Sequence, residues 1–478
     1  MKLIARLLLI TAIILGTNIS AEAQFGNLKN KLKKTIEKTN GNRNGNGNGN
    51  NTASEEKVSI SGKSFYVSTK GSARGDGSKA TPMKDIQKAI DAASNGDIVR
   101  IAEGNYLGTL DRGWIEIKGK YVSLEGGWNS DFTERNPTKY ITRMQPTTQQ
   151  AGTIGMGLLM LDVVTNKNAS MIIDGIFFDL GNLLAYCPAN PDPRNGWPEG
   201  CETGRMLPVG QSNREIRLIR GNVAGNLTVR NCIFMNASCY GMWLGHTGGN
   251  WEIYNNVFVS NVFASVEIFG RLNAQTGAHQ AKVDFHHNTV LFSWCRTKEM
   301  EDMGYGYRYK NGVDHDVHHN IFGCSNLGAL DAGWSEATLP AEKRKICSAY
   351  DNYFFMNKGD LIKAGTSGGA WLYVPASRFD EVEELKEYER NIELPSSSNF
   401  KDAIDQAYLK GFANLKVMTN SSYDPNSAAN VYREAHGMNK QGVSTTRVSM
   451  FGNRYNFDKA VELFGVEQNY GAQEPVME

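Results

Sequence analysis

Four segments share one pattern: WEIYNNVF (residues 251–258), VDFHHNTV (283–290), DVHHNIF (316–322) and SAYDNYFF (348–355). In each, a strand of alternating apolar and polar residues ends at an asparagine, and Phe or Val follows closely. These asparagines, Asn256, Asn288, Asn320 and Asn352, are each 32 residues apart. A strand–turn–strand unit with a fixed period buries its apolar face only against neighbouring units. The spacing therefore predicts a solenoid.

The same pattern extends towards the N-terminus. NLTVRNCIF places Asn231 24 residues before Asn255, with Cys232 replacing the second asparagine, and MIIDGIFF places Gly175 at an earlier bend. A further short strand precedes each bend strand, at residues 215–219, 242–244, 265–269, 305–310 and 328–332. Alternation along such strands sends every second side chain to the outside. The expected fold is an all-β solenoid.

The first residues have the composition of an export signal. Lys2 and Arg6 precede a short apolar run, and Ala21-Glu22-Ala23 fits a cleavage site, so residues 1–23 are predicted to be a signal peptide. The run is too short for a membrane span, and we expect none after signal removal. Residues 24–57 are predicted to be a basic leader followed by a flexible Asn/Gly-rich linker.

Net charge and cysteine content limit the binding partners and the disulfides that the chain can have. The formal net charge is only +1, so no global field favours nucleic acid, and we expect a monomer that does not bind it. Seven cysteines are an odd number for an exported chain. Cys187 and Cys201 flank a Pro/Gly-rich loop that a disulfide could close, whereas Cys232 and Cys347 fit buried positions.

The N-terminal part of the predicted solenoid resembles a known family. FYVSTKG, TPMKDIQKAIDAA and GDIVRIAEGNY, followed by VSLEGGWNSDFTERNP, resemble the opening of right-handed parallel β-helix proteins. Many of these are exported bacterial polysaccharide lyases, epimerases and surface proteins. The resemblance implies three parallel strands per coil over residues 58–375, and export to the periplasm or cell surface of a Gram-negative bacterium.

Helices are expected at both ends of this solenoid. Thr81 is a natural N-cap with Pro82 at the first helical position, and Met83, Ile86, Ile90 and Ala93 would line the buried face of a capping helix. Residues 376–478 contain charged amphipathic patterns such as RFDEVEELKEYERN, which predict a C-terminal helical cap region.

One outward row on the bend strands is acidic. The repeat predicts the row Thr228, Glu252, Asp284, Asp316 and Ser348, beside a second row of Arg230, Tyr254, His286, His318 and Tyr350. Three stacked carboxylates repel one another unless they are compensated. A bound Ca²⁺ at Glu252, Asp284 and Asp316 would compensate them, because calcium prefers oxygen ligands. Water, His286 or His318 would serve as well.

The other outward row, on the strands that precede the bends, has a composition suited to acidic sugars. It is predicted to read Arg217, Trp243, Glu267, Arg308 and Asp331, with His246, Arg271 and Lys310 just beyond the strand ends. Exposed Trp beside Arg and Lys suits a sugar ring that carries a carboxylate. The candidate substrate-binding residues are thus Trp243, Arg217, Arg271 and His246. An ordinary charged surface with one partly packed Trp would give the same sequence.

The family resemblance implies chemistry on acidic, uronate-containing polysaccharides, most simply β-elimination. This reaction needs a base, a cation for the developing enolate and a proton donor. The candidate catalytic residues are Lys310 as base, Arg308 as carboxylate neutraliser and Glu267 beside them. Arg271 is an alternative neutraliser, and Tyr307, Tyr309 or His246 would donate the proton. A non-catalytic glycan-binding or structural surface protein is the alternative. An inverting hydrolase ranks third, because no adjacent-aspartate motif is present.

Overall fold

The computed structural model describes residues 60–108, 114–145, 157–179, 217–393 and 469–475, all within one compact unit, Glu55–Glu478. Gaps in this description lie at 236, 238, 260, 262, 272–278, 280, 292, 294–303, 324, 326–327, 332–344, 356, 358 and 365–370. The predicted signal peptide, leader and linker lie outside the described residues, as do residues 394–468. Among the described residues, no helix is long and apolar enough to cross a membrane.

The described strands form three nine-stranded sheets, which we name A, B and C. Sheet A contains β1 (Ser64–Ser72), β2 (Ile98–Ala102), β5 (Ser123–Trp128), β8 (Ser170–Asp174), β11 (Asn226–Arg230), β14 (Gly249–Tyr254), β17 (Ala281–His286), β20 (Val313–His318) and β23 (Cys347–Tyr350). Sheet B contains β3 (Gly104–Leu107), β6 (Thr142–Gln145), β9 (Ile176–Asp179), β12 (Ile233–Met235), β15 (Val257–Val259), β18 (Thr289–Leu291), β21 (Ile321–Gly323), β24 (Tyr353–Phe355) and β27 (Ile392–Glu393). Sheet C contains β4 (Ile115–Lys118), β7 (Gly157–Val163), β10 (Arg217–Val223), β13 (Tyr240–His246), β16 (Ala264–Gly270), β19 (Tyr305–Tyr309), β22 (Gly328–Asp331), β25 (Leu361–Ala364) and β26 (Trp371–Val374).

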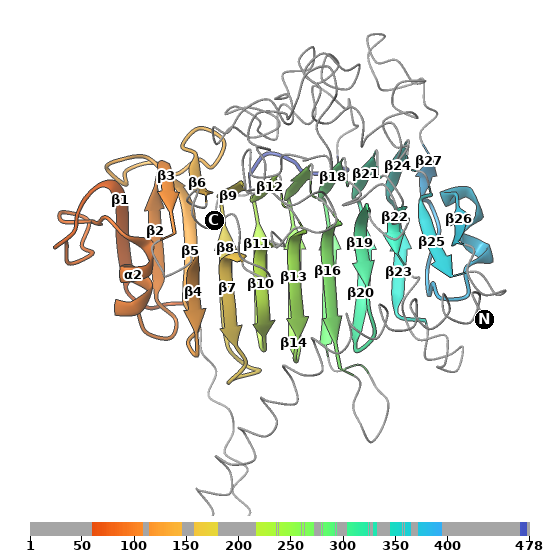
Figure 1. Cartoon of the computed structure of the whole chain (residues 1–478), viewed down its shortest axis with the longest axis horizontal. Coiled ribbons are helices and arrows are strands. Elements are labelled where there is room, and N and C mark those ends of the chain that lie inside the picture. The colour runs from red at the N-terminus through yellow and green to blue at the C-terminus, as the bar shows by residue number, and fades with distance from the viewer. Residues whose placement is uncertain are drawn as a thin grey trace, which may run out of the picture. The chain divides into compact units, whose positions relative to one another are not determined.

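Each coil runs through sheet C, then sheet A, then sheet B, and the next coil lies beside it (Figure 1). The pairings are parallel, apart from the antiparallel pair of β25 and β26. This arrangement is the predicted parallel β-helix. The predicted short strands before each bend strand form sheet C, and the bend strands themselves form sheet A.

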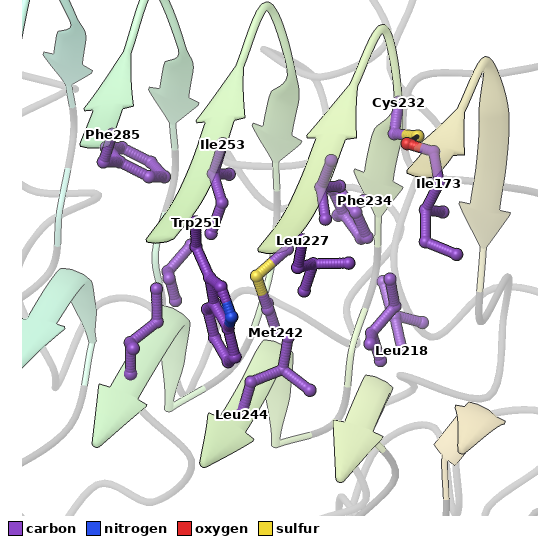
Figure 2. Close-up of a cluster of buried hydrophobic side chains, with 14 of the residues drawn as sticks. Ile173, Leu218, Leu227, Cys232, Phe234, Met242, Leu244, Trp251, Ile253 and Phe285 are labelled. Carbon is purple, nitrogen blue, oxygen red and sulfur yellow. Dashed lines mark hydrogen bonds between the residues drawn. The ribbon is translucent and has the colours of Figure 1, made fainter. Parts of the chain in front are cut away.

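The core fills the space between the three sheets, and its side chains stack from coil to coil (Figure 2). The rings of Phe178, Phe234 and Phe258 lie nearly parallel, with centroids 5.1 and 4.6 Å apart. Trp251 and Phe285 are also fully buried. Burial of aromatic side chains supplies much of the energy of such a core, and each coil depends on its neighbours for it.

The asparagines form the predicted interior ladder at the bend from sheet A to sheet B. The backbone N–H of Asn256 donates to Oδ1 of Asn288 (3.1 Å), that of Asn288 to Asn320 (2.9 Å), and that of Asn320 to Asn352 (3.1 Å). All four side chains are fully buried. The ladder satisfies backbone groups that have no strand partner at the bend.

The residue before each rung has a left-handed backbone. Its φ is 53° at Asn231 and Asn255, 51° at His287, 53° at His319 and 50° at Asp351. Asn, Asp and His are the non-glycine residues that tolerate this conformation best, which explains their recurrence here.

The N-terminal helix differs from its prediction at its start. Helix α2 (Ile86–Ala92) has Asp85 as N-cap, whose side chain accepts from Gln87 N, whereas Thr81 was predicted. Met83 instead bridges to β1, so the chain before Asp85 is extended. The amide of Gln87 donates to Glu116 O (3.0 Å) and accepts from Glu116 N (2.8 Å), pairing with the edge of β4 as a strand would.

The C-terminal side also differs, because the coils continue beyond residue 375. Residues 376–393 form a short 3₁₀ helix, η3 (Ala376–Glu381), a bridge between Leu385 and Cys347, and strand β27. Asn391 accepts from Asn352 N (3.0 Å) and so adds a rung to the ladder. The segment predicted as an amphipathic helix over 378–391 is therefore part of a coil. Cys232 and Cys347 are free and buried, while Cys187 and Cys201 lie outside the described residues.

Candidate functional site

The outer face of sheet C brings three of the predicted site residues into one row. Trp243 lies opposite Glu267, Glu267 opposite Arg308, and Arg308 opposite Asp331. Arg220, however, lies opposite Trp243 in this row, and the predicted member Arg217 lies opposite Tyr240. Leu218 and Ile219 are both fully buried, which breaks the simple alternation at the start of β10 and shifts the outward arginine by three positions.

Glu267 lies at the centre of a buried ion-pair network, which we name the sheet C cluster (Trp243, Glu267, Arg308, Lys310 and Asp331). Nη1 of Arg308 is 2.9 Å from Oε2 of Glu267, and its Nε donates to Oδ2 of Asp331 at 2.6 Å. Nε1 of Trp243 donates to Oε1 of Glu267 (3.1 Å), and Nζ of Lys310 is 3.8 Å from the same atom. Glu267, Arg308 and Asp331 are 5%, 4% and 2% exposed.

Glu267 and Arg308 remain charged although both side chains are buried. Burial opposes ionisation of Glu267, but Lys310 and Arg308 outweigh it, and the pKa of Glu267 lies below its ordinary value. Burial likewise opposes the charge on Arg308, but Glu267 and Asp331 raise its pKa well above the usual range. Paired charges in a low-dielectric site are strongly coupled, so each depends on the presence of the others.

Aromatic side chains cover this network on the outside of the sheet. The Arg308 guanidinium lies 4.6 Å from the Tyr305 ring centroid and 5.3 Å from that of Phe263. Tyr240 packs against Phe263, with ring centroids 4.8 Å apart, and burial raises the Tyr240 pKa well above its usual value. The charges are thus enclosed by a second, smaller apolar cluster that lies outside the main core.

Trp243 is half-buried and already packed. The guanidinium carbons of Arg217 and Arg220 lie 4.7 and 5.6 Å from its ring centroid, and the Phe269 ring is 4.7 Å away. Two arginines and the rings of Phe269 and Tyr240 therefore surround the indole. The cationic groups Arg217, Arg220 and Lys310 are all partly exposed around it.

Two predicted substrate-binding residues lie apart from this cluster. His246 is 1% exposed, stacks on Trp251 at 3.8 Å between ring centroids, and contacts Lys282 O through Nε2 (3.0 Å). Burial lowers its pKa to about 3. It lies three residues after Trp243, and this odd separation puts the two side chains on opposite faces of the strand. Arg271 follows the end of β16 and is exposed.

The predicted acidic row on sheet A is also present, since Glu252 lies opposite Asp284 and Asp284 opposite Asp316. Each carboxylate has its own partner. The distances are 3.5 Å from Glu252 to Nε2 of His286, 3.0 Å from Asp284 to Nε2 of His318, and 3.7 Å from Asp316 to Nζ of Lys282. Within the described ranges, no group of three or more His, Cys, Asp or Glu side chains is arranged to hold a metal ion. The acidic row therefore has histidine and lysine partners within the protein, and calcium binding at Glu252, Asp284 and Asp316 stays a prediction.

The neighbouring row on sheet A forms one continuous stack, which we name the sheet A ladder. In its C-terminal half, the rings of Tyr254, His286, His318 and Tyr350 stack at 5.0, 5.1 and 5.1 Å between centroids. Its N-terminal half is ionic. The members of the ladder, in order, are Tyr66, Arg100, Glu125, Asp174, Arg230, Tyr254, His286, His318 and Tyr350.

Two further histidines were missed at the sequence level. His287 and His319 sit at left-handed bend positions, and their Nδ1 atoms lie 2.7 and 2.8 Å from Nδ1 of His286 and His318. The repeated tripeptide His-His-Asn was the available signal. A second ladder was missed as well, at Asn261, Ser293, Ser325 and Asn357, again 32 residues apart. Asn261 accepts from Ala237 N, and Asn357 from Ser325 N.

Comparison with known proteins gives only remote likenesses. No protein-family model and no curated protein matches the chain. Among solved structures, a pectin methylesterase mutant in complex with a hexasaccharide is 11% identical, with a TM-score of 0.32, over 74% of this chain and 96% of that one. A pectate lyase is 10% identical, with a TM-score of 0.30, over 87% and 98%. A rhamnogalacturonan lyase is 12% identical, with a TM-score of 0.28, over 72% and 92%.

These likenesses are too weak to argue from. The fold rests on the sheets themselves, and the function must rest on the residues of the site.

Proposed function

We propose that this chain is an exported β-helix protein that binds an acidic, uronate-containing polysaccharide along the outer face of sheet C. The observation that carries the proposal is the group of partly exposed cations, Arg217, Arg220 and Lys310, around the packed ring of Trp243. Guanidinium and ammonium groups bind carboxylates through charge-assisted hydrogen bonds, and an aromatic ring adds apolar contact with a sugar.

The buried network has a supporting role in this proposal. Glu267 fixes Trp243 through the indole N–H and lies 3.8 Å from Lys310, so it positions both groups. Because Arg308 holds Glu267 and is itself held by Asp331, the binding surface rests on a pre-organised base. Pre-organised cations lose little conformational entropy when a ligand binds.

Binding without chemistry fits this geometry better than β-elimination. An eliminating base must hold a free lone pair, whereas the contact of Lys310 is an ion pair with Glu267. Arg308, the predicted neutraliser of the substrate carboxylate, is 4% exposed and engaged by two carboxylates of the protein. Of the three predicted catalytic residues, Lys310 is partly exposed, whereas Arg308 and Glu267 are buried.

The test is binding to uronate polysaccharides, with neutral dextran as the reference ligand, by affinity electrophoresis and calorimetry. We expect the triple variant Arg217→Gln, Arg220→Gln, Lys310→Gln to bind uronate chains at least about tenfold more weakly, because three charge-assisted contacts are removed. Lys282→Gln, which removes an exposed cation of sheet A, is the matched control and should bind normally. Unchanged binding by the triple variant would overturn the proposal.

The same samples test for catalysis. Unsaturated uronate ends absorb in the ultraviolet, and we expect no such absorbance with any polysaccharide of the panel, with or without calcium. Absorbance that disappears in Lys310→Gln would establish elimination at sheet C in place of binding alone.

A further inference from the structure

Two pairs of adjacent histidines lie on successive coils, where sheet A ends and the bend to sheet B begins. His286 and His318 are the last residues of β17 and β20, and His287 and His319 follow them at the left-handed bend positions. The two rings of each pair are nearly perpendicular, with 87° between their planes. All four side chains are half-buried, so solvent reaches both pairs.

Within each pair, the Nδ1 atoms face each other. They are 2.7 Å apart in the pair of His286 and His287, and 2.8 Å apart in the pair of His318 and His319. A hydrogen bond across such a gap needs one nitrogen that carries a proton and one that has a free lone pair. Two lone pairs at this distance repel each other unless a positive charge compensates them. The protons on the far side of each ring therefore decide what a pair can hold.

The acidic row of sheet A fixes the proton of His286 and of His318 on the far nitrogen, Nε2. Oδ1 of Asp284 lies 3.0 Å from Nε2 of His318, and Oε1 of Glu252 lies 3.5 Å from Nε2 of His286. Because ionised carboxylates only accept, Nε2 carries the proton in both rings, and Nδ1 keeps its lone pair. A carboxylate behind the far nitrogen is also the common outer partner of a metal-binding histidine.

The two bend histidines differ in what their far nitrogens contact. Oδ1 of Asn469 lies 3.2 Å from Nε2 of His287 and accepts its proton. A neutral His287 therefore also has a lone pair on Nδ1, and it faces the lone pair of His286. Nε2 of His319 has no hydrogen-bond partner among the residues that the structure describes, so His319 can carry its proton on Nδ1 and donate to His318. Of the two pairs, the first thus lacks a proton between its nitrogens.

An extra proton is a poor solution for this first pair. Burial lowers the pKa of His286, and Asp284 opposes this only in part. Burial also lowers the pKa of His287, although the contact with Asn469 raises it. Both rings are therefore neutral above about pH 7, where the ordinary imidazole is already mostly unprotonated. A metal ion is the other positive charge that imidazole nitrogens bind.

The distance between the two nitrogens selects the kind of metal ion. Imidazole nitrogens bind ions such as Cu²⁺, Ni²⁺ and Zn²⁺ at about 2.0–2.1 Å. Two nitrogens at right angles on such an ion are about 2.8–3.0 Å apart, whereas two nitrogens on a tetrahedral ion are about 3.3–3.4 Å apart. The 2.7 Å between His286 and His287 is closer to the right-angle arrangement. Square-planar and tetragonal sites are typical of Cu²⁺ and Ni²⁺, and tetrahedral sites of Zn²⁺.

We propose that His286 and His287 form a binding site for Cu²⁺, which their two Nδ1 atoms hold and water completes. Copper is preferred to nickel because it stands higher in the order of divalent affinities. Two protein nitrogens and water oxygens make a tetragonal site, so a third histidine, cysteine or carboxylate ligand is not required. Glu252 and Asn469 hold the two rings from behind, as outer partners of the ligands. Binding releases no proton, since neither Nδ1 carries one.

Calorimetry and electron paramagnetic resonance test the site on the full chain, with Cu²⁺ added as its chloride at about pH 7.5. We expect one tightly bound ion per chain, with a signal split by two nitrogen nuclei, and weaker binding of Zn²⁺. In His287→Asn, Cu²⁺ should bind at least about tenfold more weakly, because even the loss of an outer partner costs about 10–100-fold in metal affinity. Asparagine occupies the equivalent left-handed position at Asn255, so the backbone remains compatible.

The matched control is His319→Asn, which makes the same change one coil further along. Because the pair of His318 and His319 can satisfy itself with its own proton, this variant should bind Cu²⁺ as the native protein does. Native affinity in His287→Asn, or equal weakening in the two variants, would overturn the proposal. In the native protein, a signal split by fewer than two nitrogens would show an adventitious ion only, and tighter binding of Zn²⁺ than of Cu²⁺ would refute the right-angle geometry.

Discussion

The outer faces of sheets A and C carry the same kinds of residue in very different surroundings. Both present rows of charged side chains at the strand spacing. On sheet A, the carboxylates of Glu252 and Asp284 are 53% and 37% exposed and meet histidines, whereas Glu267 and Arg308 on sheet C are nearly inaccessible. Solvent replaces a lost partner on the first face and cannot do so on the second. Register therefore shows which residues share a row, but burial decides how much stability is lost when a member of that row is replaced.

The largest effect is expected on sheet C. Replacing Arg308 with methionine removes the buried guanidinium that pairs with both Glu267 and Asp331, and should lower the free energy of unfolding by about 3–5 kcal/mol. Chemical denaturation measures this loss. The control, Lys282→Met on sheet A, should change stability by less than about 1 kcal/mol. Similar losses in the two variants would remove the distinction between the faces.

The asparagine ladder, in the interior at the bend from sheet A to sheet B, should show an intermediate effect. Asn288→Ala removes an amide that donates to Ile253 O and His286 O and accepts from Asn256 N. Leaving buried backbone groups unsatisfied should lower stability by about 2–3 kcal/mol. Asn391→Ala, at the partly exposed last rung of the described residues, is the matched variant and should lose less in the same denaturation experiment.

Acidification should lower the stability that the ion pairs of Glu267 on sheet C contribute. The pKa of Glu267 lies below its ordinary 4.5, so its ion pairs stabilise the fold at higher pH and lose this contribution as the pH falls through the lowered pKa. Stability of the native protein should therefore fall between about pH 5 and about pH 3. In Glu267→Gln this fall should be shallower. Parallel stability–pH curves for the two proteins would show that Glu267 has the same pKa in the folded and unfolded chain.

The smallest effect is expected on the exposed acidic row. Glu252→Gln removes a carboxylate that is 53% exposed and 3.5 Å from His286, and should change the free energy of unfolding by less than about 1 kcal/mol. Thermal unfolding at neutral pH would measure it. A change as large as that of Arg308→Met would show that sheet A is coupled more tightly than its exposure suggests.

Sequence reasoning predicted the coils well because the asparagine at each bend acts as a fixed marker. From it, the rows through Glu252 and Asp284, and through Glu267 and Arg308, follow by counting alternate residues. Counting alternate residues gave the wrong position where side chains along a strand do not alternate between the two faces. Two successive buried residues in β10 put Arg220 where Arg217 was expected, and an odd separation from Trp243 sends His246 inward.

The misread C-terminal segment has a related cause. Phe379, Val382 and Leu385 are buried and three residues apart, a spacing that favours a helix. In the structure they face the core from a 3₁₀ turn and an irregular coil. Asn391, which would have revealed the coil, lies 39 residues after Asn352 rather than 32. Burial of the sheet C cluster was also unpredictable, because residues far along the chain enclose it.

The direction of the asparagine hydrogen bonds has a consequence for how the molecule is built. At the four described bends of Cys232, Asn256, Asn288 and Asn320, the backbone N–H donates to the side-chain amide oxygen of the following coil. The bend of a newly formed coil therefore keeps an unsatisfied backbone N–H until the next coil has formed. A chain that emerges N-terminus first would acquire its order as a travelling front, with the incomplete bend always at the leading edge and moving one coil at a time.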